Sequence, residues 1–114
     1  MNDADPLAER NARAHQYLQE GRDDLAIPLF EEVLAERVRV LGADHPDTIA
    51  SRNSLASAYY AAGRVDETIA LFEGVLADRL RVLGPDHPDT LTSRRNLEAA
   101  RRARESGGAS ARAP

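Results

Sequence analysis

Cysteine, lysine and tryptophan are all absent from this sequence of 114 residues, and aromatic residues make up only 4% of it. The absence of cysteine excludes disulfides, thiolate metal sites and a cysteine nucleophile. The use of arginine in place of lysine, together with much alanine, is typical of a high-GC bacterial genome. With so few aromatic residues, a core has to be built from Leu, Val, Ile and Ala, which suits packed helices better than a sheet sandwich. The length and composition therefore favour one soluble, all-α domain.

The sequence contains no segment that marks a membrane or secreted protein. No apolar run approaches the roughly 20 residues that cross a bilayer. The N-terminal residues 1–9 are acidic and lack the basic start and apolar stretch of a signal peptide. We therefore expect a cytoplasmic location and no membrane partner.

The charges are distributed unevenly along the chain. Residues 1–93 contain 17 acidic residues and 9 arginines, whereas residues 94–114 contain 2 acidic residues and 6 arginines, so the formal charges are −8 and +4. An acidic body with a basic end can steer partners or attract a second copy head to tail. A terminal helix whose charges are simply solvated would produce the same pattern.

An internal repeat is the strongest signal in the sequence. Residues 83–90 (LGPDHPDT) nearly repeat residues 41–48 (LGADHPDT), at a spacing of 42 residues. The same spacing pairs Gly21 with Gly63, and about half of all positions match. A period near 40 residues is typical of helical solenoids.

Each repeat unit has the pattern of two helices. Apolar residues such as Ile69, Phe72 and Val75 recur at steps of three, four and seven, which places them on one helix face. The pattern predicts five helices, at residues 5–20, 23–41, 46–62, 65–83 and 88–105. The loops between them are short, so neighbouring helices should be antiparallel. The small, polar residues 106–114 are expected to be a disordered tail.

Helix ends are also marked in the sequence. Asp44 or Asp47 is expected to accept hydrogen bonds from the free N–H groups of the helix that begins at Pro46. Gly63 and Gly84 are expected to end helices in the left-handed conformation.

Residues 53–59 (NSLASAY), followed by Gly63-Arg64 and later by Ile69 and Phe72, resemble a tetratricopeptide repeat. The 42-residue period and the LGxDHPDT junction are similar to the long variant in kinesin light chains and many bacterial proteins. The resemblance covers about residues 11–97. It implies an antiparallel helix-pair solenoid within residues 1–105, with repeats at about 5–42 and 46–84 and a capping helix at 88–105. It also implies a non-enzymatic module for protein–protein interaction, with a partner that the sequence does not identify.

The sequence departs from the repeat pattern at three positions. Arg13 stands where the second repeat has Leu55, and Arg101 stands where it has Tyr59, so both ends are interpreted as polar caps of a solenoid. Pro28 lies inside a predicted helix, where proline can cost about 3 kcal/mol. We therefore expect a kink near this residue or a later helix start.

The resemblance implies that the first helix of each repeat lines a concave groove. Asparagine carboxamides there can pair with the backbone of an extended peptide, and Arg95 and Arg102 can clamp a carboxylate. Alternatively, Asn11 and Asn53 bond neighbouring helices and the arginines only solvate a cap. The candidate peptide- or protein-binding residues, which lie on one face of each helix because they are three or four positions apart, are Asn11, His15, Leu18, Asn53, Ser57, Tyr60, Arg95, Asn96 and Arg102.

Other kinds of chemistry receive little support. His45 and His87 lie among aspartates, but helix capping explains these junctions and their spacing fits no standard metal-ligand pattern, so we expect no metal and no cofactor. The serines lack a nucleophile elbow, and no catalytic constellation emerges, so we expect no enzymatic activity. The body is acidic and stacking aromatics are scarce, which argues against nucleic acid as a partner.

Self-association is the alternative function. Leucines near both ends are expected to remain partly exposed, and a small domain gains stability by covering such patches. A twofold dimer or an exchange of the terminal helix would cover them. Met1 and the two polar caps favour a stand-alone unit. The leucines in question are Leu7, Leu18, Leu25, Leu91 and Leu97.

Overall fold

The computed structural model describes residues 6–107, and within this range every regular element is an α-helix. The helices α1 to α5 begin and end within one residue of the predicted positions. Their bounds are α1 Pro6–Gln19, α2 Asp23–Leu41, α3 Pro46–Ala61, α4 Val65–Leu83 and α5 Pro88–Glu105. The predicted tail from residue 108 onward lies outside the described residues, whereas Ser106 caps α5 and its Oγ donates to the carbonyl of Arg102 at 3.0 Å.

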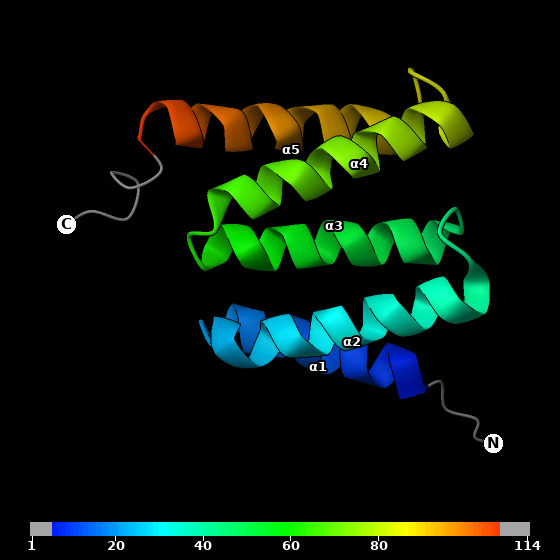
Figure 1. The fold of residues 1–114 in the computed structure, drawn as a ribbon, viewed down its shortest axis with the longest axis vertical. Coiled ribbons are helices and arrows are strands. Elements are labelled where there is room, and N and C mark those ends of the chain that lie inside the picture. The colour runs from blue at the N-terminus through cyan, green and yellow to red at the C-terminus, as the bar shows by residue number, and fades with distance from the viewer. Residues whose placement is uncertain (1–5, 108–114) are drawn as a thin grey trace.

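Consecutive helices pack against each other in an antiparallel stack (Figure 1). The stack is elongated, with extents of 49 × 34 × 20 Å, and the ends of the described chain lie at its opposite ends (Figure 1). Each helix contacts its neighbours in the sequence, so α2, α3 and α4 are each packed between two helices. The predicted fold class, an all-α antiparallel helix-pair solenoid, is confirmed.

Glycine ends the helices as the sequence predicts. Gly63, with φ +80°, follows the C-cap residue of α3, and Gly84, with φ +89°, is itself the C-cap of α4. A left-handed backbone is costly for residues with a Cβ, so glycine is required at these turns.

Histidine, and not aspartate, caps the helices that follow the two repeated junctions. The Nδ1 of His45 accepts a hydrogen bond from the backbone N–H of Asp47 at 3.0 Å, and His87 makes the same bond with Asp89. The prediction that Asp44 or Asp47 would be the cap is wrong. Asp44 instead accepts a hydrogen bond from Arg81 at 2.8 Å. Thus the histidine of the junction has a structural role in this chain.

Replacement of His45 by alanine is expected to lower the free energy of unfolding by about 1 kcal/mol, because one free N–H group of α3 loses its acceptor. Chemical denaturation followed by circular dichroism measures the change. Replacement of His45 by asparagine is the matched control, since asparagine is a good cap. Equal losses in the two variants would contradict the capping role.

Pro28 lies within α2 without interrupting it. The helix runs continuously from Asp23 to Leu41, and its start corresponds to Val65 in the next repeat. The expected later start is therefore wrong. Pro28 is only the sixth residue of the helix and is exposed, so it removes a single helical hydrogen bond near the N-terminus.

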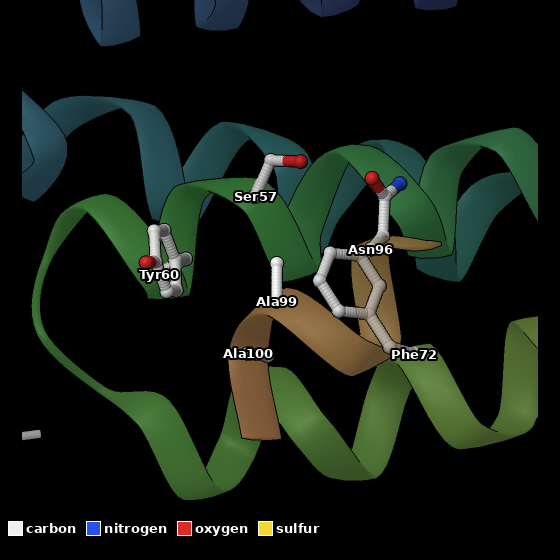
Figure 2. A pocket seen from close by; sticks show the side chains of 6 residues that line it. All are labelled: Ser57, Tyr60, Phe72, Asn96, Ala99 and Ala100. Carbon is white, nitrogen blue, oxygen red and sulfur yellow. The ribbon is translucent and has the colours of Figure 1, made fainter. Parts of the chain in front are cut away.

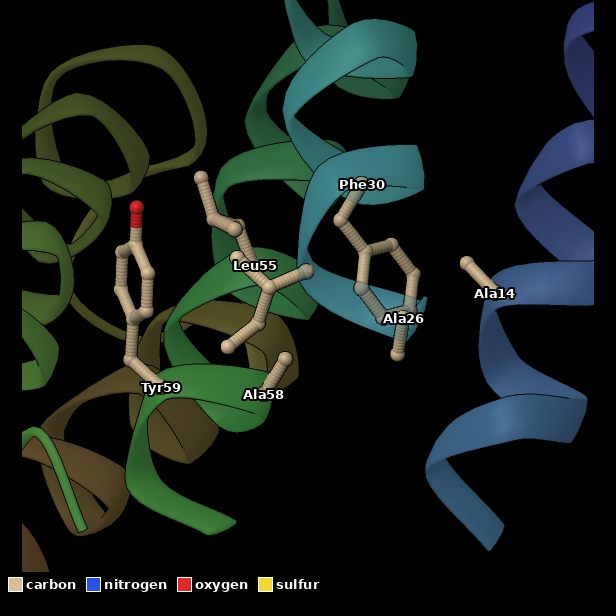
Figure 3. Close-up of a cluster of buried hydrophobic side chains, with 7 residues drawn as sticks. Ala14, Ala26, Phe30, Leu55, Ala58 and Tyr59 are labelled. Atoms are coloured by element: carbon tan, nitrogen blue, oxygen red, sulfur yellow. The ribbon is translucent and has the colours of Figure 1, made fainter. Parts of the chain in front are cut away.

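The core consists of two clusters of buried apolar side chains. The first joins α1, α2 and α3 around Phe30, which is 1% exposed (Figure 3). The second joins α3, α4 and α5 around Phe72. Leu97 belongs to the second cluster and is 5% exposed, so the expectation that it would remain at the surface is wrong. Leu91, by contrast, is 39% exposed, as expected.

Buried polar side chains lock each repeat to the next. Arg37 of α2 donates a hydrogen bond to Ser51 of α3 at 2.8 Å, and its backbone carbonyl accepts one from Thr48 at 3.3 Å. Thr48 and Ser51 are buried, so these bonds satisfy groups that water cannot reach. The same contacts recur 42 residues later, where Arg79 bonds Ser93 and Thr90.

Arg101, which was interpreted as part of a polar cap, is exposed and also pairs with the preceding helix. It contacts Glu73 of α4 at 3.0 Å. In the preceding repeat, Tyr59 donates to Glu31 at 2.8 Å, and these two residues are the 42-residue equivalents of the first pair. Burial, and then the hydrogen bond to Glu31, raise the pKa of Tyr59. Arginine thus replaces tyrosine as the partner of the repeated glutamate.

Candidate functional site

The nine candidate residues lie on α1, α3 and α5, the first helices of the successive repeat units. The structure brings three of them, Ser57, Tyr60 and Asn96, together around one hollow. The other six candidate residues do not line this hollow.

Asn11 and Asn53 occupy equivalent positions, 42 residues apart. Both side chains are half-buried, and the Oδ1 atom of each is buried without a hydrogen-bond partner among the described residues. The alternative that these oxygens bond neighbouring helices is therefore not supported. A buried carbonyl oxygen without a donor costs about 1–3 kcal/mol, which favours rotation of the carboxamide toward any donor that a ligand brings to the surface.

His15 and Leu18 are partly structural. The ring of His15 packs against Phe30 in a T-shaped arrangement with centroids 4.8 Å apart. Its Nε2 lies 3.4 Å from the Oγ of Ser54 on α3. Leu18 is half-buried against the first core cluster. His15 therefore covers one side of Phe30 and spans the gap between α1 and α3.

A hollow of about 200 Å³ lies between α3 and α5. Figure 2 shows Ser57 and Tyr60 on α3, Asn96 on α5, and Phe72 reaching toward them from α4. Tyr60 is 46% exposed and stands at the rim. Sequence reasoning identified the rim residues, but it missed the three apolar ones, which are Phe72, Ala99 and Ala100.

The two arginines on α5 are exposed and make few contacts. Arg95 forms no ion pair within residues 6–107, and Arg102 lies 3.8 Å from Glu98 of the same helix. An exposed pair at this distance contributes little to stability, so both guanidinium groups remain available to an anion.

A network of charged residues fixes α3 against α4 outside the candidate site. Asp78 is bonded to Arg52 and to Arg81, and Arg81 also reaches Asp44 at 2.8 Å. Burial would raise the pKa of Asp78, but the two arginine hydrogen bonds outweigh it and hold this pKa below its ordinary value. Arg81 is the 42-residue equivalent of Arg39. The recurrence of arginine at this helix position could have indicated part of this network.

Between residues 6 and 107 no three His, Asp or Glu side chains are grouped to hold a metal ion. None of the five helices has the length and apolar character that a bilayer crossing needs.

The stacked helix pairs and their 42-residue period define a helical-repeat protein. Two tetratricopeptide repeat models match the sequence, one over residues 7–67 and the other over residues 48–89. The chain belongs to the tetratricopeptide repeat family. Such repeats are generally non-enzymatic scaffolds that mediate protein–protein interactions.

Two solved structures show the same fold. Both contain the nearly identical TPR-like repeats of a putative kinesin light chain from Podosopora anserina, and the second of them is a single-residue variant. The first is 34% identical with a TM-score of 0.80 over 93% of this chain, and the variant is 35% identical with a TM-score of 0.77 over 89%. This chain spans 50% and 48% of their lengths. No curated protein matched the sequence.

Proposed function

We propose that this chain binds an extended peptide segment of a partner protein along the face formed by α1, α3 and α5, and that it catalyses no reaction. The repeated pair of unpartnered asparagine oxygens carries this proposal. An extended peptide presents backbone N–H groups at regular intervals, and each half-buried asparagine can accept one of them once its carboxamide turns toward the surface. Binding would then remove an existing cost of the free protein in two successive repeats.

The arginines on α5 indicate the charge that the bound peptide should carry at that end of the face. Arg95 and Arg102 are exposed and lie on α5, whereas the candidate residues of α1 and α3 carry no carboxylate. Guanidinium groups bind carboxylates through paired hydrogen bonds. We therefore propose that an acidic part of the peptide, or its C-terminal carboxylate, lies over α5.

Replacement of both Asn11 and Asn53 by alanine is expected to weaken peptide binding by roughly 5- to 150-fold, because two hydrogen bonds of about 0.5–1.5 kcal/mol each are lost. Linear peptides selected from a random display library serve as ligands, and fluorescence anisotropy measures their affinity. Replacement of the exposed Gln19 of α1 by alanine is the control, and it should leave the affinity unchanged.

The circular dichroism spectra of both variants must match the unsubstituted protein for the comparison to hold. Affinity that survives the double replacement would refute the role of the asparagines. Failure of the library to yield any peptide that competes for this face would refute the proposed function itself.

Self-association is a second candidate, favoured by a specific set of residues at the start of α5. Asp86, Leu91 and Arg94 are the 42-residue equivalents of Asp44, Ile49 and Arg52. In the earlier set, Asp44 bonds Arg81 and Arg52 bonds Asp78, both on α4. Ile49 is buried and lines a hollow together with Val82 and Leu83 at the end of α4. In contrast, Leu91 is 39% exposed, and neither Asp86 nor Arg94 has an ion pair within the described residues.

We propose that the C-terminal end of α2 in a second copy covers this surface, after the ion pair between its Glu36 and Arg39 opens. It carries Glu36, Arg39 and Leu41, the equivalents of the α4 residues that engage the earlier set. Leu41 and its neighbour Val40 are 39% and 58% exposed. Such a contact joins two different surfaces, so it would produce open chains or rings and not a closed pair.

Replacement of Leu91 by arginine is expected to abolish concentration-dependent growth of the molar mass above the 12.4 kDa monomer. Light scattering during size-exclusion chromatography measures this mass. Replacement of Leu80 by arginine is the matched control, because Leu80 is similarly exposed, at 36%, on α4. It should leave the concentration dependence of the molar mass unchanged. A protein that remains monomeric at every concentration would exclude the second candidate.

A further inference from the structure

The hollow above Phe72 has a filled counterpart in the first repeat. Phe72 and Phe30 are 42 residues apart, and so are Ser57 and His15. In the first repeat, the imidazole of His15 packs on Phe30 with ring centroids 4.8 Å apart. In the second, the small hydroxymethyl group of Ser57 leaves the corresponding space above Phe72 open (Figure 2).

A polar residue at the rim of the hollow also has an equivalent in the first repeat. The Nε2 of His15 lies 3.4 Å from the Oγ of Ser54, and the equivalent of Ser54 is Asn96. Asn96 lines the hollow, where its carboxamide can both donate and accept a hydrogen bond. The open space therefore combines an apolar floor with a polar group at the position that meets the imidazole edge in the first repeat.

We infer that this hollow is a specificity pocket for one histidine side chain of the bound peptide. Its volume of about 200 Å³ is enough for a planar ring, since an apolar cavity of about 150 Å³ binds benzene. The ligand ring packs on Phe72 as His15 packs on Phe30, and a ring nitrogen bonds the carboxamide of Asn96. The chain thus supplies the ring itself in one repeat and receives it from the ligand in the next.

This inference rests on the proposed peptide binding, but it can be tested without a peptide. The probe is histidine blocked at both ends, titrated at pH 8, where a side chain with a pKa of about 6.5 is neutral. NMR of the full chain should show saturable shifts of the Phe72 ring and of the Asn96 side-chain amide. Blocked alanine should produce none. Blocked phenylalanine should bind at least about fivefold more weakly, because it leaves the carboxamide of Asn96 without a partner.

Replacement of Ser57 by histidine provides the internal control. The new ring should fill the hollow as His15 does in the first repeat, and it should eliminate the shifts caused by blocked histidine. Replacement of Ser57 by alanine should preserve them. Shifts that persist in the S57H variant, or that do not involve Phe72 and Asn96, would place the probe elsewhere and overturn the inference.

Two further outcomes separate the pocket from the peptide groove. Blocked phenylalanine that binds as tightly as blocked histidine would show that the hollow selects apolar rings and not imidazole, which also overturns the inference. Saturable histidine binding in a protein for which no peptide ligand can be selected would support the pocket and reject the groove.

Discussion

Replacement of Phe30 by alanine is expected to lower the free energy of unfolding by about 3–5 kcal/mol, because it removes a large side chain from a closed core. Phe30 is 1% exposed and joins three helices, since the first core cluster contains side chains from α1, α2 and α3. His15 covers its ring from the groove side. Domains of this size are stable by about 5–15 kcal/mol in total, so the variant should be close to unfolding. Urea denaturation followed by circular dichroism measures the loss.

The same replacement at Phe72 is the matched comparison, and it should cost less. Phe72 occupies the equivalent position, but it borders the open hollow and is 6% exposed. A side chain beside a void has already lost the packing contacts on that side, so fewer contacts disappear with the ring. Equal losses at the two positions would show that the hollow does not weaken the packing of Phe72. A larger loss at Phe72 would contradict the role of His15 in covering Phe30.

The difference between these two phenylalanines also shows what the sequence can and cannot predict. The 42-residue repeat predicts the helices and their antiparallel order, because both follow from periodicity and short loops, whereas the groove face was implied only by the family resemblance. The open hollow is associated with changes at its lining positions within that repeat, among them the change from His15 to Ser57. A sequence comparison shows this change but not its consequence, because the consequence depends on which neighbours reach into the space.

The errors at charged and polar positions have a similar origin. Asp44 was expected to cap a helix because aspartate is a common cap, yet Arg81 of a later helix bonds it and His45 makes the cap instead. Arg101 was interpreted only as a residue of a polar cap, and the structure adds a hydrogen bond to Glu73 at 3.0 Å. In each case a residue far away in the sequence supplies the partner. Local patterns do not contain that information, although the matching 42-residue pairs could have suggested it.

Replacement of Asn53 by leucine is expected to stabilise the free protein by about 1–3 kcal/mol, which is the cost of a buried oxygen without a donor. The Oδ1 of Asn53 is buried and has no partner among the described residues. Leucine has nearly the same shape and carries no polar atom, so it removes that cost without leaving a cavity. Urea denaturation of the free protein measures the gain.

Replacement of Asn53 by alanine separates the effect of removing the buried oxygen from the effect of filling the space. It also removes the oxygen but leaves space behind, so its gain should be smaller than that of leucine. Both variants should bind selected peptides more weakly than the unsubstituted protein, since neither side chain can accept a hydrogen bond. Stability that rises while affinity falls is the expected result for a residue kept for binding at a cost to the free protein. A leucine variant less stable than the unsubstituted protein would show instead that Asn53 supports the fold, and the proposed peptide contact would then lose its main physical argument.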